Sequence, residues 1–159
     1  MTAVSSGPPA LLEAWSRWQG TIACSHTQHE WTAPQLRAIT NEAARRMAGA
    51  GLQSGDAVGF VMANTAAFPV ALMALLQIGC NPVLLYAGTT PNDLGRNAAL
   101  LGMRWLIHDF NEALSRLPKE DHAAAAVLEV AGVPVHVIPV GSESDGTPVP
   151  AHVEGVVLH

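Results

Sequence analysis

The fold is decided by residues 54–86, which read SGDAVGFVMANTAAFPVALMALLQIGCNPVLLY. Gly55-Asp56 is a turn signal, and the apolar run 57–62 that follows has the length and the side chains of a buried strand. Asp56 is the last charged residue before this run. The first part of the stretch therefore predicts a turn that leads directly into the core.

The second part of the stretch predicts a helix and another strand. Asn64-Thr65 offers side-chain oxygens that would cap a helix over about residues 65–78, which is apolar on nearly every side. Gly79 ends this helix, because glycine adopts the left-handed backbone conformation of a helix terminus without strain. Residues 82–86 then form the next buried strand. The result is a strand-helix-strand unit whose helix must pack against a sheet.

The segments on either side extend this pattern. Thr32 is placed to cap a helix that has Pro34 in its first turn, and Thr90 precedes Pro91 in the same way. Helices are predicted at residues 11–18, 34–48, 90–102, 111–117 and 121–131, the last two being separated by Pro118. Strands are predicted at residues 21–24, 30–32, 104–107, 134–140 and 156–158, with an exposed loop over 141–150.

Strands and helices alternate from residue 57 onward, which predicts an α/β fold. Such a rhythm is typical of a mostly parallel sheet with helices on both faces. We expect a tail and short helix at 1–20, an α/β subdomain at 21–140, a loop at 141–154 and the start of a further strand at 155–159.

Composition excludes several classes of protein. The formal net charge is -5, with 8 Lys plus Arg against 13 Asp plus Glu, so the basic excess of a nucleic-acid binder is absent. Residues 57–92 carry no charge, but Pro69, Gly79 and Pro82 interrupt them, and we expect no membrane span. Residues 1–10 do not have the pattern of a secretory leader, and a cytoplasmic protein is predicted.

Each candidate motif is better explained by structure than by chemistry. Gly49, Gly51 and Gly55 follow a helix and precede a strand, whereas a dinucleotide loop requires the opposite order. His26 and His29 lie in a hairpin turn, and a metal would need further ligands.

The remaining candidates do not assemble into a site either. The pair His108-Asp109 follows a strand, where α/β sheets bind ligands, but a single such pair is weak evidence. Lys119, the only lysine, is expected in solvent, and Cys24 and Cys80 are expected to be free core thiols. We therefore predict no catalytic, cofactor-binding or metal-binding residue within this chain.

Three segments together resemble the start of the adenylate-forming superfamily: residues 31–36, 54–65 and 78–83. This superfamily comprises AMP-dependent acyl and aryl CoA synthetases, nonribosomal-peptide adenylation domains and luciferases. The similarity covers about residues 30–109, the N-terminal portion of such an enzyme. Asp93 stands where the family pattern usually has Glu.

The resemblance implies that the complete parent joins a carboxylic acid to AMP with ATP and Mg²⁺, and then transfers the acyl group to a thiol. The family's phosphate loop, ribose-binding Asp and catalytic lysine come later in such sequences, and residues 155–159 are similar to the strand that leads into the phosphate loop. We expect the isolated chain to be catalytically incompetent and to pair with the remainder of the enzyme, a partner protein or its own copy.

Two alternatives stay open. One is a truncated, non-catalytic interaction module that docks on a partner protein through surface the rest of an enzyme would cover. The other is a flavodoxin-like binder of a small ligand at the strand ends near Ala63-Asn64, Tyr86-Ala87 and His108.

Overall fold

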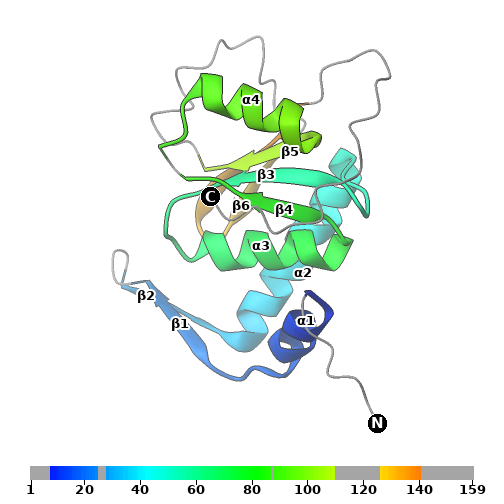
Figure 1. Ribbon diagram of the computed structural model, residues 1–159. Coiled ribbons are helices and arrows are strands. Elements are labelled where there is room, and N and C mark those ends of the chain that lie inside the picture. The colour runs from blue at the N-terminus through cyan, green and yellow to red at the C-terminus, as the bar shows by residue number, and fades with distance from the viewer. Residues whose placement is uncertain (1–7, 25–27, 87, 110–125, 141–159) are drawn as a thin grey trace.

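The computed structural model describes residues 8–24, 28–86, 88–109 and 126–140 (Figure 1). Their elements follow the order α1 (Pro8–Arg17), β1 (Thr21–Cys24), β2 (His29–Thr32), α2 (Ala33–Ala50), β3 (Ala57–Val61), α3 (Ala67–Ile78), β4 (Asn81–Leu84), α4 (Pro91–Leu101), β5 (Met103–His108), β6 (Ala126–Val130) and β7 (Val133–Pro139). Among the described helices, none has both the length and the apolar character needed to cross a bilayer.

A five-stranded sheet in the order β4-β3-β5-β7-β6 forms the centre of the molecule. β3 pairs in parallel with β4 and with β5, as the alternation of strands and helices predicts. β7 pairs antiparallel with β5 and with β6, so the sheet is mixed at that side. β1 and β2 form the predicted separate hairpin, and the α/β class is confirmed.

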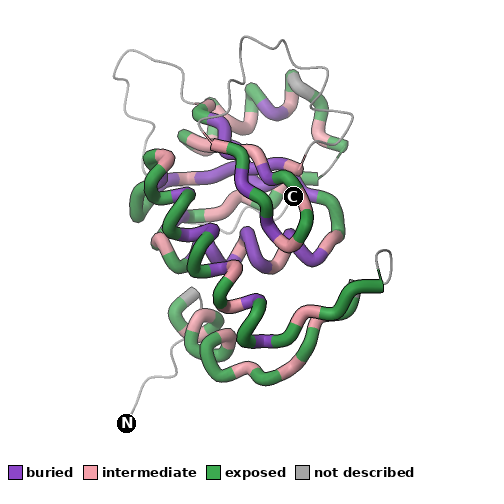
Figure 2. The backbone as a smooth tube through the Cα atoms, turned by 180° about the vertical axis from the view of Figure 1, so that it is seen from behind, coloured by how far each residue is buried: buried purple, intermediate pink, exposed green. Residues whose placement is uncertain are grey.

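Helices cover both faces of this sheet (Figure 1). α2 and α3 enclose one core cluster against β3, which includes Leu36, Leu75 and the fully buried ring of Phe60. α4 lies on the opposite face, where Leu94 packs in a second cluster with Leu106. Figure 2 shows the buried residues concentrated along the central strands and on the inward sides of the helices.

The strand-helix-strand unit forms as predicted, with one correction at the start of its helix. α3 begins at Ala67 instead of residue 65, and its N-cap is Ala66, which makes no side-chain cap. Asn64 is exposed and is not the cap. The predicted end is confirmed, because Gly79 has the left-handed φ of 90° and donates its N–H to the carbonyls of Leu75 and Leu76.

The predicted helix over 121–131 is wrong where the structure describes it, because Ala126–Val130 is strand β6. Leu128 and Val130 are buried while Glu129 is exposed, which is the alternation of a strand with one face on the core. Ala131 and Gly132 both have positive φ, 50° and 80°, and form a two-residue hairpin turn into β7. The helix predicted at 111–117, the loop at 141–150 and the strand at 156–158 lie outside the described residues.

Two predicted helix starts are confirmed. The Thr32 hydroxyl accepts from the N–H of Gln35, and the Gln35 side chain accepts from the N–H of Thr32 at 2.9 Å, a reciprocal capping box. The Thr90 hydroxyl accepts from the N–H of Asp93 at the start of α4. Asp93 therefore serves the first turn of the helix, where its charge also favours the helix dipole.

Replacing Gly79 by alanine is expected to lower the free energy of unfolding by about 2 kcal/mol. The φ of 90° is strained for any side chain, and a Cβ there would lie 2.6 Å from the Ser54 hydroxyl oxygen. Gly95→Ala is the matched control, because a Cβ in that exposed part of α4 meets nothing within 4 Å. Urea denaturation should show Gly95→Ala to be neutral or stabilising, and equal effects of the two changes would contradict this account.

Candidate functional site

The chain changes direction within the sheet at β3. From β3 it crosses through α3 to β4 on one side, and from β4 it crosses through α4 to β5 on the other side of β3. α3 and α4 lie on opposite faces of the sheet (Figure 1), and the carboxyl ends of β3 and β5 lie side by side between the two connections, where Val61 pairs with His108. Open α/β sheets bind their ligands at such a switch point.

The turn that follows β3 forms one side of this edge. The N–H of Thr65 donates to the carbonyl of Ala63 at 2.9 Å, and the N–H of Phe68 donates to the carbonyl of Thr65 at 3.1 Å. The backbone is thus folded tightly before α3 begins. The Thr65 hydroxyl is buried and makes no hydrogen bond within the part of the chain that the structure describes.

The residues that end β5 form the other side. Asp109 reaches across to the end of β3, where its Oδ2 accepts from the N–H of Ala63 at 2.8 Å. Its second oxygen, Oδ1, is buried and has no hydrogen-bond partner among the described residues. Two buried oxygens near this edge, one from Thr65 and one from Asp109, therefore lack hydrogen-bond partners among the described residues; we call them the unpaired oxygens.

A pair of histidines lies at the same edge of the sheet, at the end of β5 and on β7. His108 is 2% exposed, and its ring stacks on that of His136 with centroids 5.2 Å apart and an interplanar angle of 13°. The two residues are direct register partners in the β5–β7 pairing. Sequence analysis did not select His136; its one signal is its position in the alternating strand 133–139, which an isolated histidine does not make specific.

The carboxyl ends of β3 and β5 bring together only part of what the sequence suggested. Ala63 and the pair His108-Asp109 do meet at this edge, although they are far apart in the sequence. Tyr86 does not join them, because its side chain is 79% exposed beyond the end of β4. Ala87 lies outside the described residues.

Protonation of His136 gives a pH-dependent stability. Burial lowers the pKa of His136 from its ordinary value of 6.5, so the unfolded state binds a proton more readily than the folded state. The stability contributed by neutral His136 is therefore complete above about pH 6.5 and is lost as the pH falls through the lowered pKa. His136→Gln should flatten the decline in the free energy of unfolding between pH 7.5 and 5.0.

Urea denaturation across this pH range provides the measurement, and His29→Gln provides the control on an exposed imidazole. The ring of His29 contacts that of Trp31 at a centroid distance of 4.3 Å and an interplanar angle of 54°, and His29 lies on the surface of the hairpin. A decline that is equally steep in His136→Gln and in the unmodified chain would exclude His136 as its source.

Other candidate residues have structural roles. Burial, followed by the nearby charge of Asp56, raises the pKa of the Cys80 thiol to about 11, so this cysteine is unreactive at neutral pH. Gly55 has a φ of 89° in the turn between α2 and β3. No group of three metal-ligating side chains occurs in the described segments, while His26, Lys119 and the Cys24 side chain lie outside them.

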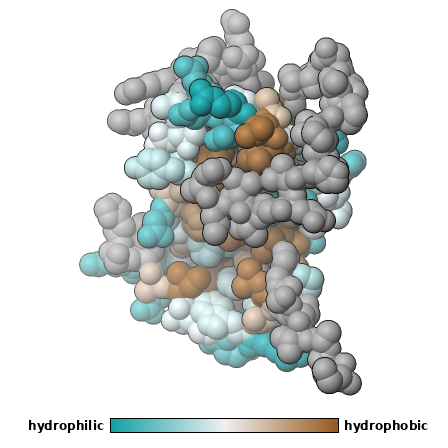
Figure 3. Space-filling view, viewed as in Figure 1, coloured by the Kyte–Doolittle hydropathy of each residue, from teal (hydrophilic) through white to brown (hydrophobic). Residues whose placement is uncertain are grey.

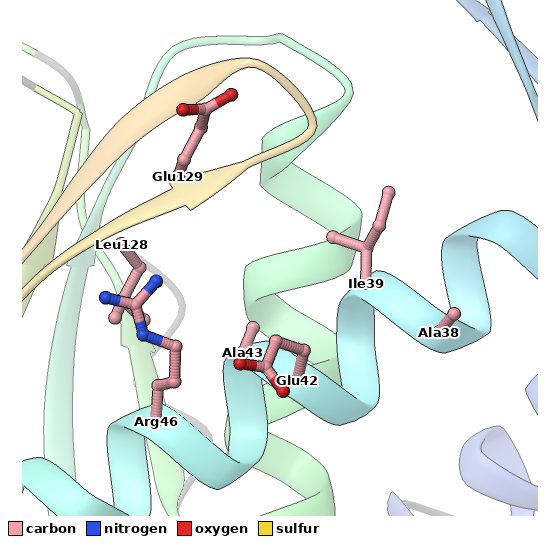
Figure 4. Close-up of a pocket in the computed structure, with 7 residues that line it drawn as sticks. All are labelled: Ala38, Ile39, Glu42, Ala43, Arg46, Leu128 and Glu129. Carbon is pink, nitrogen blue, oxygen red and sulfur yellow. The ribbon is translucent and has the colours of Figure 1, made fainter.

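A hollow of about 300 Å³ lies between α2 and β6 (Figure 4). It is lined by Ala38, Ile39, Glu42, Ala43, Arg46, Leu128 and Glu129. Arg46 extends toward β6 and donates to the carbonyl of Val127 at 3.3 Å, while Glu42 pairs with Arg45 at 2.7 Å. The lining includes no nucleophile and no imidazole, so it offers no chemistry of its own.

The chain was compared with models of protein families and with curated proteins. The family model described as AMP-binding enzyme matches residues 11–156. The comparison with curated proteins finds no significant match.

Solved structures share the fold. The N-terminal subdomain of NpsA from Klebsiella oxytoca matches with a TM-score of 0.58 and 20% identity, over 67% of this chain and 28% of that one. MbtA from Mycobacterium smegmatis matches with 0.55 and 29%, over 62% and 19%. O-succinylbenzoate coenzyme A synthetase (MenE) from Bacillus subtilis, solved with AMP, matches with 0.56 and 19%, over 64% and 27%. The matched part of this chain corresponds to less than a third of each of these proteins.

Proposed function

The chain belongs to the AMP-binding enzyme family, and on that premise we propose that it forms the N-terminal scaffold of an AMP-forming acyl or aryl acid ligase. In the complete enzyme, ATP would adenylate a carboxylic acid with release of pyrophosphate. A thiol, from CoA or from a carrier-protein pantetheine, would then take the acyl group. The observation that carries the proposal is the family match over residues 11–156, together with structural neighbours such as the coenzyme A synthetase above.

The described residues do not fit ATP and Mg²⁺, which the complete enzyme would use. Stabilising the negative charge on a triphosphate while it reacts requires positioned cations and backbone amides. Every arginine in the described segments is already engaged locally, by carboxylates or by backbone carbonyls: Arg17, Arg37, Arg45, Arg46, Arg96 and Arg104. We therefore assign no adenylation step to these residues and propose that residues 1–159 alone are catalytically incompetent.

An ATP–pyrophosphate exchange assay over a panel of aliphatic and aromatic acids tests this. The isolated chain should show no exchange above the no-protein background, while the complete O-succinylbenzoate coenzyme A synthetase, assayed with O-succinylbenzoate, serves as a positive control. Exchange that depends on one of the acids would overturn the scaffold assignment, because it would require a nucleotide site within these residues.

Exposed apolar side chains favour a second candidate, a non-catalytic interaction module that docks on a partner protein. Tyr86 is 79% exposed, Leu100 is 62% exposed and Leu84, at the end of edge strand β4, is 49% exposed. Apolar side chains also reach the surface between polar ones in Figure 3. The same surface would serve for contact with the remainder of the ligase or with a second copy of the chain. Light scattering that shows a stable monomer at high concentration would count against self-association.

We also propose that the protein works in the cytoplasm. Cys80 is a buried free thiol, which suits a reducing compartment. Fluorescence microscopy of the tagged chain in the producing cell would test this, and an extracellular signal would contradict it.

A further inference from the structure

We propose that edge strand β6 pairs antiparallel with β6 of a second copy of this chain, with the two-fold axis at Leu128, so that the two sheets join into one. This pairing does not involve the chemistry of the proposed ligase. Its failure would therefore leave the scaffold assignment intact.

β6 is the last strand on its side of the sheet among the strands that the structure describes. Pro134 has no N–H, so its partner Glu129 belongs to a pair without ladder hydrogen bonds. Because bonded and non-bonded pairs alternate, Val127 belongs to such a pair as well. The N–H and C=O groups of Val127 and Glu129 therefore point away from β7, to the side where a further strand would pair.

The opposite edge of the sheet, β4, is a poorer acceptor of a strand. The N–H groups of Asn81 and Leu85 donate to carbonyls at and just before β3, so residues 82 and 84 face outward. Pro82 has no N–H, which leaves Leu84 with the one outward donor within β4. β6 has two outward donors and no proline. Strand pairing is therefore favoured at β6 over β4.

The outward groups of β6 are complementary to themselves. In an antiparallel register centred on Leu128, Val127 lies opposite Glu129 of the second copy, and the reverse holds on the other side of the axis. Each of these two facing pairs exchanges two backbone hydrogen bonds, so all four outward donors find acceptors. The Val127 side chain, which is 48% exposed, then lies against the added strand.

Charges on α2 favour the same arrangement. In the single chain, Arg46 covers the carbonyl of Val127 through an exposed contact of 3.3 Å. Figure 4 shows Arg46 beside Leu128 at one end of the hollow, and Glu42 further along α2. The two-fold axis reverses these positions, so Arg46 of each copy faces Glu42 of the other. When an N–H of the second copy takes the Val127 carbonyl, Arg46 is released to pair with that carboxylate.

Sedimentation velocity of the whole chain between about 1 μM and about 1 mM tests self-association. A pair held by one short strand should have a dissociation constant of about 10–100 μM, because small interfaces are weak. Amide hydrogen exchange locates the contact. The N–H groups of Val127 and Glu129 should become protected about fivefold or more as the concentration rises through this range, whereas those of Leu128 and Val130 face β7 and should be protected throughout.

A proline in β6 tests the backbone pairing. Val127→Pro removes an outward donor without removing a hydrogen bond between β6 and β7, and it should weaken association about tenfold or more. Leu84→Pro is the matched control, because Leu84 also has an outward N–H and a similar exposed fraction, 49%, on β4. It should leave the dissociation constant unchanged.

A charge exchange on α2 tests the register separately, and it keeps the experiment decisive if Val127→Pro fails to fold. Arg46→Glu alone and Glu42→Arg alone place like charges opposite each other, and each should weaken association about tenfold. The two changes together restore opposite charges across the axis. They should return the dissociation constant to within about threefold of its value in the unmodified chain.

Several results would overturn the proposal. The chain could stay monomeric up to about 1 mM. Leu84→Pro could weaken association as much as Val127→Pro does, or the combined charge exchange could remain as weak as the single changes. The N–H groups of Val127 and Glu129 could stay unprotected in the associated chain. Equal protection at every dilution would mean that another segment of the same chain covers β6.

Discussion

Replacing Asp56 by alanine is expected to lower the free energy of unfolding by about 3 kcal/mol, from two lost charge-assisted hydrogen bonds and the donors they leave behind. Asp56 is 7% exposed, and its Oδ2 accepts from the N–H of Gln53 at 2.9 Å and from the indole N–H of Trp105 at 3.2 Å. Alanine leaves both donors without this acceptor in a region that is partly buried. Urea denaturation followed by tryptophan fluorescence provides the measurement.

Two further variants separate the contributions of Asp56. Asp56→Asn keeps an oxygen that can accept both hydrogen bonds, so its effect should be smaller, about 1 kcal/mol. Arg104→Ala removes only the ion pair to Asp56, at 3.7 Å, and the arginine side chain is 70% exposed. A change below about 0.5 kcal/mol is expected for that solvent-screened pair. If Arg104→Ala lowered the free energy of unfolding as much as Asp56→Ala does, the hydrogen bonds to Trp105 and Gln53 would not be the main contribution of Asp56 to stability.

The position of Asp56 links this stability to the register of β3 and β5. The β3–β5 register shifts between Ala57 and Val58, which pair with Met103 and Trp105, so Arg104 is the extra residue of a bulge. Asp56 contacts both Arg104 and Trp105 immediately beside this bulge. We infer that Asp56 fixes the register of β5 against β3. This register places Asp109 beside Ala63 at the other end of the two strands.

The strand-helix-strand unit was predictable because local signals and burial agree there. The Gly55-Asp56 turn, the apolar run after it and the Gly79 stop each act within a few residues. The prediction that Asn64 caps α3 was wrong because Asn64 and Thr65 belong to a tight turn before the helix. In this turn the N–H of Thr65 donates to the carbonyl of Ala63. A good capping residue does not show which neighbouring backbone amide begins the helix.

Strand β6 was missed for a different reason. Ala-rich residues 122–126 favour a helix locally, whereas β6 is held by its pairing with β7 through a turn at Ala131 and Gly132. Alanine at a positive φ gives no clear sequence signal, unlike the Asn-Gly turns usual in such hairpins. Tertiary pairing therefore overrode local preference over these residues.

The arrangement at the carboxyl ends of β3 and β5 could be predicted only in pieces. The sequence places His108-Asp109 after a strand and Ala63 after another, yet the hydrogen bond that joins Asp109 to Ala63 spans 46 positions. The order of the strands in the sheet decides which strand ends become neighbours. The alternation of predicted strands and helices along the sequence does not determine that order. The unpaired oxygens are visible only once the packing around them is known.

Phe60→Ala is expected to lower the free energy of unfolding by about 4 kcal/mol, the largest loss that we predict for a single side chain. The Phe60 ring is 1% exposed and lies in the core between β3 and α3. It meets the ring of Phe68 edge to face, with centroids 4.9 Å apart at 84°. Truncation therefore removes buried area, leaves a cavity and breaks an aromatic pair.

Because small domains are only about 5–15 kcal/mol stable, Phe60→Ala could fail to fold, and Phe60→Leu keeps the experiment decisive. Leucine keeps most of the buried volume and should cost about 1 kcal/mol, measured by urea denaturation. Leu100→Ala is the control, because that side chain is 62% exposed on α4 and its loss should be close to neutral. If Leu100→Ala lowered the free energy of unfolding as much as Phe60→Leu does, Leu100 would have to be covered in solution. The core between β3 and α3 would then not be the main source of stability.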